Sequence, residues 1–301
     1  MSEIYLVFVV FLFVLAVFDL MVGVSNDAVN FLNSAIGAKV AKFRTIIIVA
    51  TVGVFMGATM SNGMMEVARN GVFHPAMFSL KELMFIFLAV MISDVILLDI
   101  FNNLGLPTST TVSLVFELLG GTTAFVLLKL ANDTTGLTVG DLMNTEKALG
   151  MIMAIFVSVA IAFFFGIVLQ YISRLVFTFT YKKNIKWKIG IFGGVATTAI
   201  FYFMLFKGIK SMSFVTPEIY EYIQNHTLAI LGICFLASTA IMQFLYFLKV
   251  NVFKILVLMG TFALAMAFAG NDLVNFIGVP LAGYSAFTDF AASGAWDPST
   301  S

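Results

Sequence analysis

The sequence predicts an all-α integral membrane protein, built as a multi-span helical bundle with inverted-topology repeats and discontinuous helices. Three observations support this prediction. Hydrophobic residues make up 61% of the 301 residues and charged residues only 11%, whereas soluble domains average about 45–50% and about 25%. Long apolar stretches recur along the chain. One short polar motif occurs twice, each time directly after such a stretch.

Composition also excludes several functions. The formal net charge is zero, so nothing indicates a nucleic-acid partner. The single cysteine, Cys234, lies in an apolar run and cannot form an internal disulfide. The N-terminal 20 residues lack a basic region and a small-residue cleavage site, so we expect a retained first span rather than a signal peptide. No segment has the size of a soluble domain, and neither a cofactor nor an enzymatic activity is expected.

Eight segments meet the requirement of about 20 mostly apolar residues for a membrane-crossing helix. They are 4–24, 45–65, 83–101, 108–130, 148–170, 189–209, 227–248 and 252–269. The fourth segment is ambiguous, because Gly120 and Gly121 at its centre fit either a continuous span or the tip of two half-helices that enter and leave on one side.

Basic residues predict the orientation, since short loops rich in Lys and Arg mark the cytoplasmic side. If all eight segments cross, the basic clusters fall on one side and the N-terminus lies outside. If the fourth segment were a hairpin, the larger cluster would lie outside, so the charges favour a full crossing or a compensating break elsewhere. The clusters contain Lys39, Lys42 and Arg44, then Arg174, Lys182, Lys183, Lys186 and Lys188, and finally Lys249 and Lys254.

The duplicated motif indicates an inverted repeat. Its first copy follows a segment that runs inward and its second copy a segment that runs outward, an arrangement from which many transporters build a site at the membrane midplane. Chance recurrence is the alternative, but five identities share one offset. We therefore expect a first repeat at 1–131, intervening helices and a basic loop at 132–225, and the start of a second repeat at 226–301. Asn26, Asp27, Val29, Asn30 and Phe31 recur as Asn271, Asp272, Val274, Asn275 and Phe276.

Carboxylates lie in or near the apolar segments, whereas Lys and Arg are confined to segment ends and loops. A charge at the bilayer centre costs about 2.5–3.5 kcal/mol on insertion scales, so the expected counter-ion is a small cation or a proton. Asp beside Asn at a helix break offers oxygen ligands that suit sodium. The alternative is that single carboxylates are protonated and only hydrogen-bonded. The acidic residues are Asp19, Asp27, Asp94, Asp99, Glu117 and Asp272, and the predicted sodium ligands are Asn26, Asp27, Asn30, Asn271, Asp272 and Asn275.

A second motif, "NNLGLPTSTTVS" at 102–113, predicts an anion site. Pro107 suits the first turn of a helix, and four hydroxyl residues then crowd that turn. Free backbone N–H groups, the helix dipole and the hydroxyls would together bind a phosphate or a sulfate. An ordinary helix cap is the alternative, although one cap needs only one hydroxyl. The four residues are Thr108, Ser109, Thr110 and Thr111.

Other polar residues give weaker signals. Glu66 and Arg69 are spaced i, i+3 and fit either an interfacial ion pair or a role in coupling or gating. His74 and His226 lack His or Cys companions, so sodium is the only metal ion expected. Trp187, beside its lysines, is typical of an anchor at the membrane interface.

Together these motifs resemble the PiT family of inorganic phosphate transporters, which are sodium- or proton-coupled symporters with inverted repeats. The resemblance rests on "GVSNDAVNFLNSAIGAKV", "EVARNG", "GLPTSTT" and "AGNDLVNFIGVPLAG", and it covers most of the chain. It implies that the two Asn-Asp pairs help to form cation sites and that the residues from Thr108 to Thr111 contact the anion. It also implies that Glu66 matches an acidic position tied to transport.

The chain departs from the family pattern at three places. Val112 stands where the family often has a histidine, which leaves proton handling at that position in doubt. No motif of the family is found in 132–188. A second P-x-S-T-T is missing after the second Asn-Asp motif, so we expect the given chain to stop before the protein does.

The predicted function is phosphate transport coupled to sodium, or less favourably to protons, by alternating access. The protein would be multi-pass in the cell membrane, the cytoplasmic membrane if prokaryotic, with phosphate, sodium ions and the lipid bilayer as partners. Homo-oligomers are left open. Transport of sulfate or another oxyanion is a close alternative, and Glu117 is the candidate for accepting the proton that distinguishes phosphate from sulfate. An intramembrane aspartyl protease or a channel is a more distant alternative.

Overall fold

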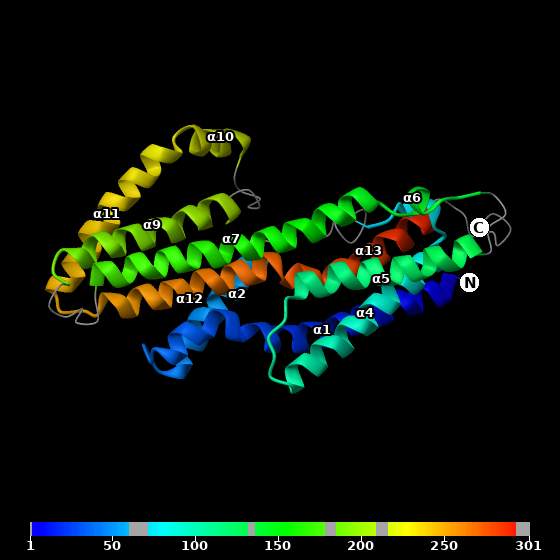
Figure 1. Cartoon of the computed structure of the whole chain (residues 1–301), viewed down its shortest axis with the longest axis horizontal. Coiled ribbons are helices and arrows are strands. Elements are labelled where there is room, and N and C mark those ends of the chain that lie inside the picture. Colours follow the sequence, from blue (N-terminus) through cyan, green and yellow to red (C-terminus); the bar gives the residue numbers. More distant parts are fainter. Residues whose placement is uncertain (1, 60–71, 132–135, 178–184, 209–215, 293–301) are drawn as a thin grey trace. The chain divides into compact units, whose positions relative to one another are not determined.

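The computed structural model describes residues 2–59, 72–131, 136–177, 185–208 and 216–292. Apart from one isolated bridge between Phe73 and Met143, all regular structure in these ranges is helical. The elements are α1 (Ser2–Gly37), α2 (Phe43–Thr59), the 3₁₀ turn η1 (Pro75–Met77), α4 (Leu80–Asn103), α5 (Thr110–Ala131), α6 (Val139–Leu142), α7 (Thr145–Phe177), α9 (Lys188–Gly208), α10 (Pro217–Asn225), α11 (Thr227–Phe247), α12 (Val252–Asn271) and α13 (Leu273–Ala292) (Figure 1).

Each of the eight apolar segments lies largely on a helix, so the predicted multi-span helical membrane bundle is confirmed. Within the described ranges, six helical stretches are long and apolar enough to cross a membrane, with α12 and α13 counted as one stretch. The second and sixth segments lie on the shorter apolar helices that begin at Phe43 and Lys188. The sequence analysis missed α13 and the amphipathic α10.

Two helices run unbroken through glycines that the sequence marks as candidate interruptions. The expected interruption at the first Asn-Asp motif is wrong, because α1 runs unbroken through it for 36 residues, about 54 Å at 1.5 Å per residue. α5 is likewise continuous through Gly120 and Gly121, so its centre is not the tip of two half-helices. The chain is interrupted at the second motif, where Asp272 alone separates α12 from α13.

The chain forms two compact units, which we describe separately. The first comprises Met1–Val29, Asn62–Val157 and Asn271–Ser301, and the second comprises Asn30–Ser61 and Ser158–Gly270. One unit boundary, at 29/30, falls inside the first Asn-Asp motif, and another, at 270/271, falls directly before the second. These units describe packing, and the repeat boundaries at 131 and 226 stay a prediction.

In the first unit, α4 and α5 pack antiparallel and α13 packs against both (Figure 1). Their core includes Leu12, Met84, Phe87, Leu118 and Val279. At the far end of the pair, the Lys129 ammonium lies 3.0 Å from a carboxylate oxygen of Glu82, whose side chain also caps the start of α4. This ion pair fixes the end of α5 beside the beginning of α4.

In the second unit, close helix packing depends on small residues. A methyl group on Gly57 of α2 would collide with the backbone oxygen of Met266 and with Ala269, both on α12. Gly53 makes the same kind of approach one turn earlier, beside Ala265. Small residues at this spacing allow membrane helices to pack at short distance. α9 and α11 pack side by side in the same unit.

Candidate functional site

The site is built where α4 ends and α5 begins. Gly105, with φ +67°, ends α4 in a Schellman turn: its N–H donates to Asn102 O, and the N–H of Leu106 donates to Phe101 O. α5 begins at Thr110, and Ser109 is its N-cap, because Ser109 Oγ accepts the N–H of Val112 at 3.4 Å. The expectation that Pro107 lies in the first turn of the helix is therefore wrong, since it precedes the N-cap by two residues.

Asn26 holds this loop in place. Its amide nitrogen donates to Leu106 O at 3.0 Å, and its amide oxygen accepts the N–H of Thr108 at 2.8 Å. A second side-chain amide also joins the two elements: Asn102 of α4 donates to the backbone oxygen of Val22 on α1 at 3.2 Å. The first Asn-Asp motif and the "PTSTT" loop thus form one structure, in which Asn26 positions the loop.

The second Asn-Asp motif is bonded to the same loop. The hydroxyl of Thr111 donates to Asp272 Oδ1 at 2.9 Å and accepts from the amide nitrogen of Asn275, also at 2.9 Å. Asp272 immediately precedes α13, and Thr111 is the second residue of α5. The N-terminus of α5 therefore lies beside this carboxylate, and the first N–H groups of a helix carry a partial positive charge. α13 begins at the residue that follows the same carboxylate.

Two buried polar atoms at this junction lack partners among the described residues. They are Oγ1 of Thr110, a residue that is 1% exposed, and Oδ1 of Asn275, also 1% exposed. Burying such a group without a hydrogen bond costs about 1–3 kcal/mol. A hydroxyl that can donate and an amide oxygen that can coordinate are therefore available for a bound anion and a bound cation.

The two copies of the duplicated motif also touch through apolar atoms. Gly23 lies against the ring of Phe276, so closely that a methyl group on Gly23 would overlap the ring. Phe276 is fully buried. The glycine before the first Asn-Asp pair therefore makes room for the phenylalanine of the second, and α1 approaches α13 at the level of the site.

A cluster of carboxyl groups lies deeper in the same unit. The hydroxyl of Ser113 is 2.6 Å from Asp94 Oδ1 and 3.0 Å from Glu117 Oε1. Asp19 from α1 is 0% exposed and lies close enough to Asp94 and Glu117 to interact electrostatically with both. Three acidic residues singled out in the sequence thus come together here. The sequence analysis gave Ser113 no role, although its i, i+4 spacing to Glu117 could have indicated one.

The other predicted residues are placed as follows. Asp27 is buried on α1, while Asn30 is exposed and belongs to the second unit. Asp99 is exposed and accepts a bond from Asn103 on its own helix. Asn271 ends α12, and its side chain is not among those described, while Glu66 and Arg69 lie outside the described residues. Across the described ranges, no three His, Cys, Asp or Glu side chains converge to hold a metal ion.

A bundle of membrane-crossing helices with helix N-termini and buried carboxylates at one internal site is the architecture of a secondary transporter. The particular family follows from comparison with known proteins. A family model described as the phosphate transporter family matches residues 23–298, and the chain belongs to that family. The predicted family is thereby confirmed, and the protein is a transporter rather than an enzyme.

A solved structure described as the sodium-dependent phosphate transporter has the same fold. It superimposes with a TM-score of 0.64 and 18% sequence identity, over 95% of this chain and 69% of that one. No curated protein sequence matches the chain.

Proposed function

We propose that this member of the family carries inorganic phosphate across the cell membrane together with sodium, and that both bind at the junction of α5 and α13. The observation that carries the proposal is the hydrogen bond between Thr111 and Asp272. It joins the motif expected to bind the anion to the motif expected to bind the cation. A similar structure is described as a sodium-dependent phosphate transporter, which supports sodium as the coupling ion.

Phosphate would bind at the start of α5. The N–H groups of Thr110 and Thr111 occupy the first turn of the helix, where no intrahelical partner exists, and the buried hydroxyl of Thr110 adds a third donor. The N–H of Thr108 is already bonded to Asn26. Of the four hydroxyl residues, Thr110 is therefore the strongest candidate for direct contact, while Thr111 links the anion to Asp272.

Coupling follows from charge. A phosphate at this helix end would lie near the Asp272 carboxylate, and two unit charges of like sign 4 Å apart repel by about 4 kcal/mol at an effective dielectric constant near 20. A sodium ion held by Asp272 and Oδ1 of Asn275 would cancel this repulsion. Phosphate would then bind tightly only when sodium is present, which is the basis of symport.

The remaining proposed sodium ligands are Asp27 and Asn271, with Asn30 one turn further along α1. Asn26 would act mainly by holding the loop. Alternating access would follow from movement of one inverted repeat against the other, as in other transporters built from such repeats.

The test is uptake of labelled phosphate into proteoliposomes that contain the purified protein, with an inward gradient of sodium, of protons or of neither. We expect the sodium gradient to drive uptake and excess sulfate to leave it unchanged. Replacing Asp272→Asn keeps the shape of the side chain and removes its charge, and it should reduce sodium-driven uptake at least tenfold, the effect of losing about 1.4 kcal/mol.

The matched control is Asp99→Asn, which makes the same substitution on α4 at an exposed carboxylate. It should leave uptake unchanged. If Asp272→Asn transports phosphate with the same dependence on sodium as the unmodified protein, Asp272 is not a cation ligand. If protons rather than sodium drive uptake, the choice of coupling ion is wrong while phosphate stays the substrate.

A further inference from the structure

Ser113 joins two carboxyl groups inside the first unit, and its contacts indicate a bound proton. Its hydroxyl oxygen lies 2.6 Å from Asp94 Oδ1 and 3.0 Å from Glu117 Oε1. A serine hydroxyl has one hydrogen, and an ionised carboxylate can only accept. The shorter contact fits donation to an ionised Asp94, since O–H···O⁻ bonds measure about 2.5–2.7 Å. The hydrogen of the longer contact would then come from a protonated Glu117, which donates to Ser113.

Asp19 on α1 gives a second and independent indication. Its side chain is 0% exposed, and neither carboxyl oxygen has a hydrogen-bond partner among the described residues. Asp94 lies within reach of it, but two ionised carboxylates both accept and neither donates. Burying a charge without a partner is strongly unfavourable. A proton on Asp19 would remove its charge and would provide a donor to Asp94.

Basic residues do not offset these carboxyl groups. Among the four described helices of the first unit that form its core, α1 and α13 contain no Lys, Arg or His. α4 has Lys81 in its first turn, and α5 has Lys129 in its last turn, where it pairs with Glu82. The other acidic residues on these helices are Glu3, Asp27, Glu82, Asp99 and Asp289, of which Glu3, Asp99 and Asp289 are exposed.

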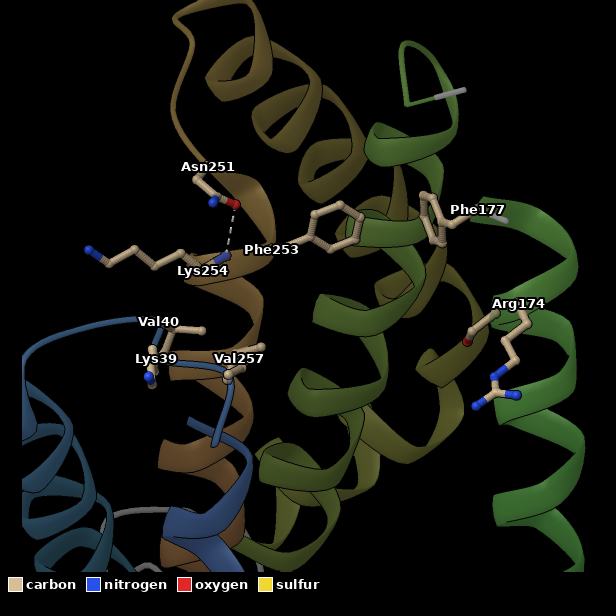
Figure 2. A pocket seen from close by; sticks show the side chains of 10 residues that line it. Lys39, Val40, Arg174, Phe177, Asn251, Phe253, Lys254 and Val257 are labelled. Atoms are coloured by element: carbon tan, nitrogen blue, oxygen red, sulfur yellow. Dashed lines mark hydrogen bonds between the residues drawn. The ribbon is translucent and has the colours of Figure 1, made fainter. Parts of the chain in front are cut away.

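The charged residues around a cavity of the second unit do not converge in this way. The cavity has a volume of about 520 Å³, and its lining comes from the turn after α1, the end of α7 and the start of α12. Figure 2 shows the Arg174 guanidinium and the Lys254 ammonium directed away from each other. These cations therefore do not form one site, whereas the carboxyl groups of the first unit are joined by direct contacts.

We propose that Asp19, Asp94 and Glu117 form a proton-binding site, separate from the junction of α5 and α13. Asp94 carries the negative charge and accepts from Ser113 and from the protonated Asp19. The protonated Glu117 donates to Ser113, so the site holds two protons around one charge. No three acidic side chains of the described ranges are placed to hold a metal ion together, whereas a proton needs only one donor oxygen and one acceptor oxygen.

The site lies on the helices that carry the "PTSTT" loop. α4 contains Asp94 and ends just before this loop, and Ser113 lies three residues after Thr110, where α5 begins. Loss of the protons would place negative charges side by side between α1, α4 and α5, and like charges disfavour such an arrangement. Proton binding therefore decides the pH range in which these helices hold the loop.

Infrared difference spectroscopy of the purified protein at neutral pH tests the site directly, because a protonated carboxyl group and a carboxylate absorb at different frequencies. Glu117→Gln and Asp19→Asn each replace a neutral acid with a neutral amide of the same shape. We expect each variant to lose one protonated-carboxyl signal. Asp94→Asn removes the charged member and should keep both signals, at shifted frequencies.

The matched control is Glu146→Gln, at an exposed position in the first turn of α7, which should leave the spectrum of protonated carboxyl groups unchanged. Ser113→Ala tests the assignment to Glu117 in a second way. It removes the acceptor of the Glu117 proton, so the signal that is absent from Glu117→Gln should stay but move to higher frequency. A signal that does not move would show that this proton is not donated to Ser113.

Two results would overturn the site. One is the absence of a protonated-carboxyl signal from the unmodified protein at neutral pH, and the other is a signal that both Glu117→Gln and Asp19→Asn leave intact. A signal that disappears when sodium is added at constant pH would assign the cluster to a metal cation instead. None of these readouts requires transport, so the outcome is independent of the proposed symport.

Discussion

Thr111 and Asp272, 161 residues apart in the chain, are joined by a hydrogen bond of 2.9 Å. Thr111 also accepts a bond from Asn275, so one hydroxyl links the "PTSTT" loop to two polar residues of the second Asn-Asp motif. Asn26 of the first motif bonds the same loop two residues before the helix begins. The loop is therefore held between the two copies of the motif, and a change in either copy would be felt at its backbone N–H groups.

Replacing Thr111→Val should weaken sodium-driven phosphate uptake. Valine matches threonine in shape but neither donates to Asp272 nor accepts from Asn275, so a buried amide donor and a carboxylate lose their partner. Losing such a pair costs about 1–3 kcal/mol, enough to reduce apparent phosphate affinity at least fivefold. The measurement is initial uptake against phosphate concentration in proteoliposomes.

Thr111→Ser is the conservative partner of this variant. It keeps the hydroxyl and should retain most of the uptake and its dependence on sodium. If the serine variant is as inactive as the valine variant, the methyl group rather than the hydroxyl is what matters, and the hydrogen bond to Asp272 has no role in coupling.

Asn26→Ala should weaken phosphate binding without changing how uptake depends on sodium. The variant releases Leu106 O and the N–H of Thr108, so the loop before α5 loses the contacts that order it. We expect the KM for phosphate to rise at least tenfold, as for a loss of about 1.4 kcal/mol. Asn33→Ala, at an exposed position on the same helix, should leave KM unchanged. A changed sodium dependence in Asn26→Ala with an unchanged KM would mean that Asn26 is a cation ligand, as the sequence alone indicated.

Much of the fold was readable from composition, because about 20 consecutive apolar residues have few alternatives to a membrane helix. The first Asn-Asp motif is where this prediction of the helices is wrong. Its polar residues predict a break in the helix, yet Asn26 and Asp27 lie on an unbroken helix and are buried in the first unit. A polar side chain that finds partners inside a bundle need not break its helix, and the sequence alone does not show those partners.

The site was predicted in part for a similar reason. The hydroxyl run and the duplicated Asp were visible because they are scarce in apolar segments. The separate roles of these residues cannot be predicted from the sequence, because they depend on which atoms form hydrogen bonds in the folded protein. Asn26 donates to a backbone oxygen, and Thr111 donates to Asp272. The sequence does not single out Ser113, because serine is common in membrane helices. Only its hydrogen bonds to two carboxyl groups in the folded protein distinguish it.

Gly23→Ala should destabilise the protein, and the direction of the effect is opposite to the usual one for this substitution in a helix. Alanine favours helix over glycine by about 1 kcal/mol, but here its methyl group would overlap the buried ring of Phe276, and overpacking costs about 1–3 kcal/mol. Gly120→Ala on α5 is the control, because no atom lies within 4 Å of the added methyl group, and it should be neutral or stabilising. Unfolding in denaturing detergent, followed by circular dichroism, measures both variants. If Gly23→Ala is as stable as Gly120→Ala, α1 and α13 are not in contact at this level. The two Asn-Asp motifs would then be connected only through their hydrogen bonds to the loop before α5 and to the start of that helix.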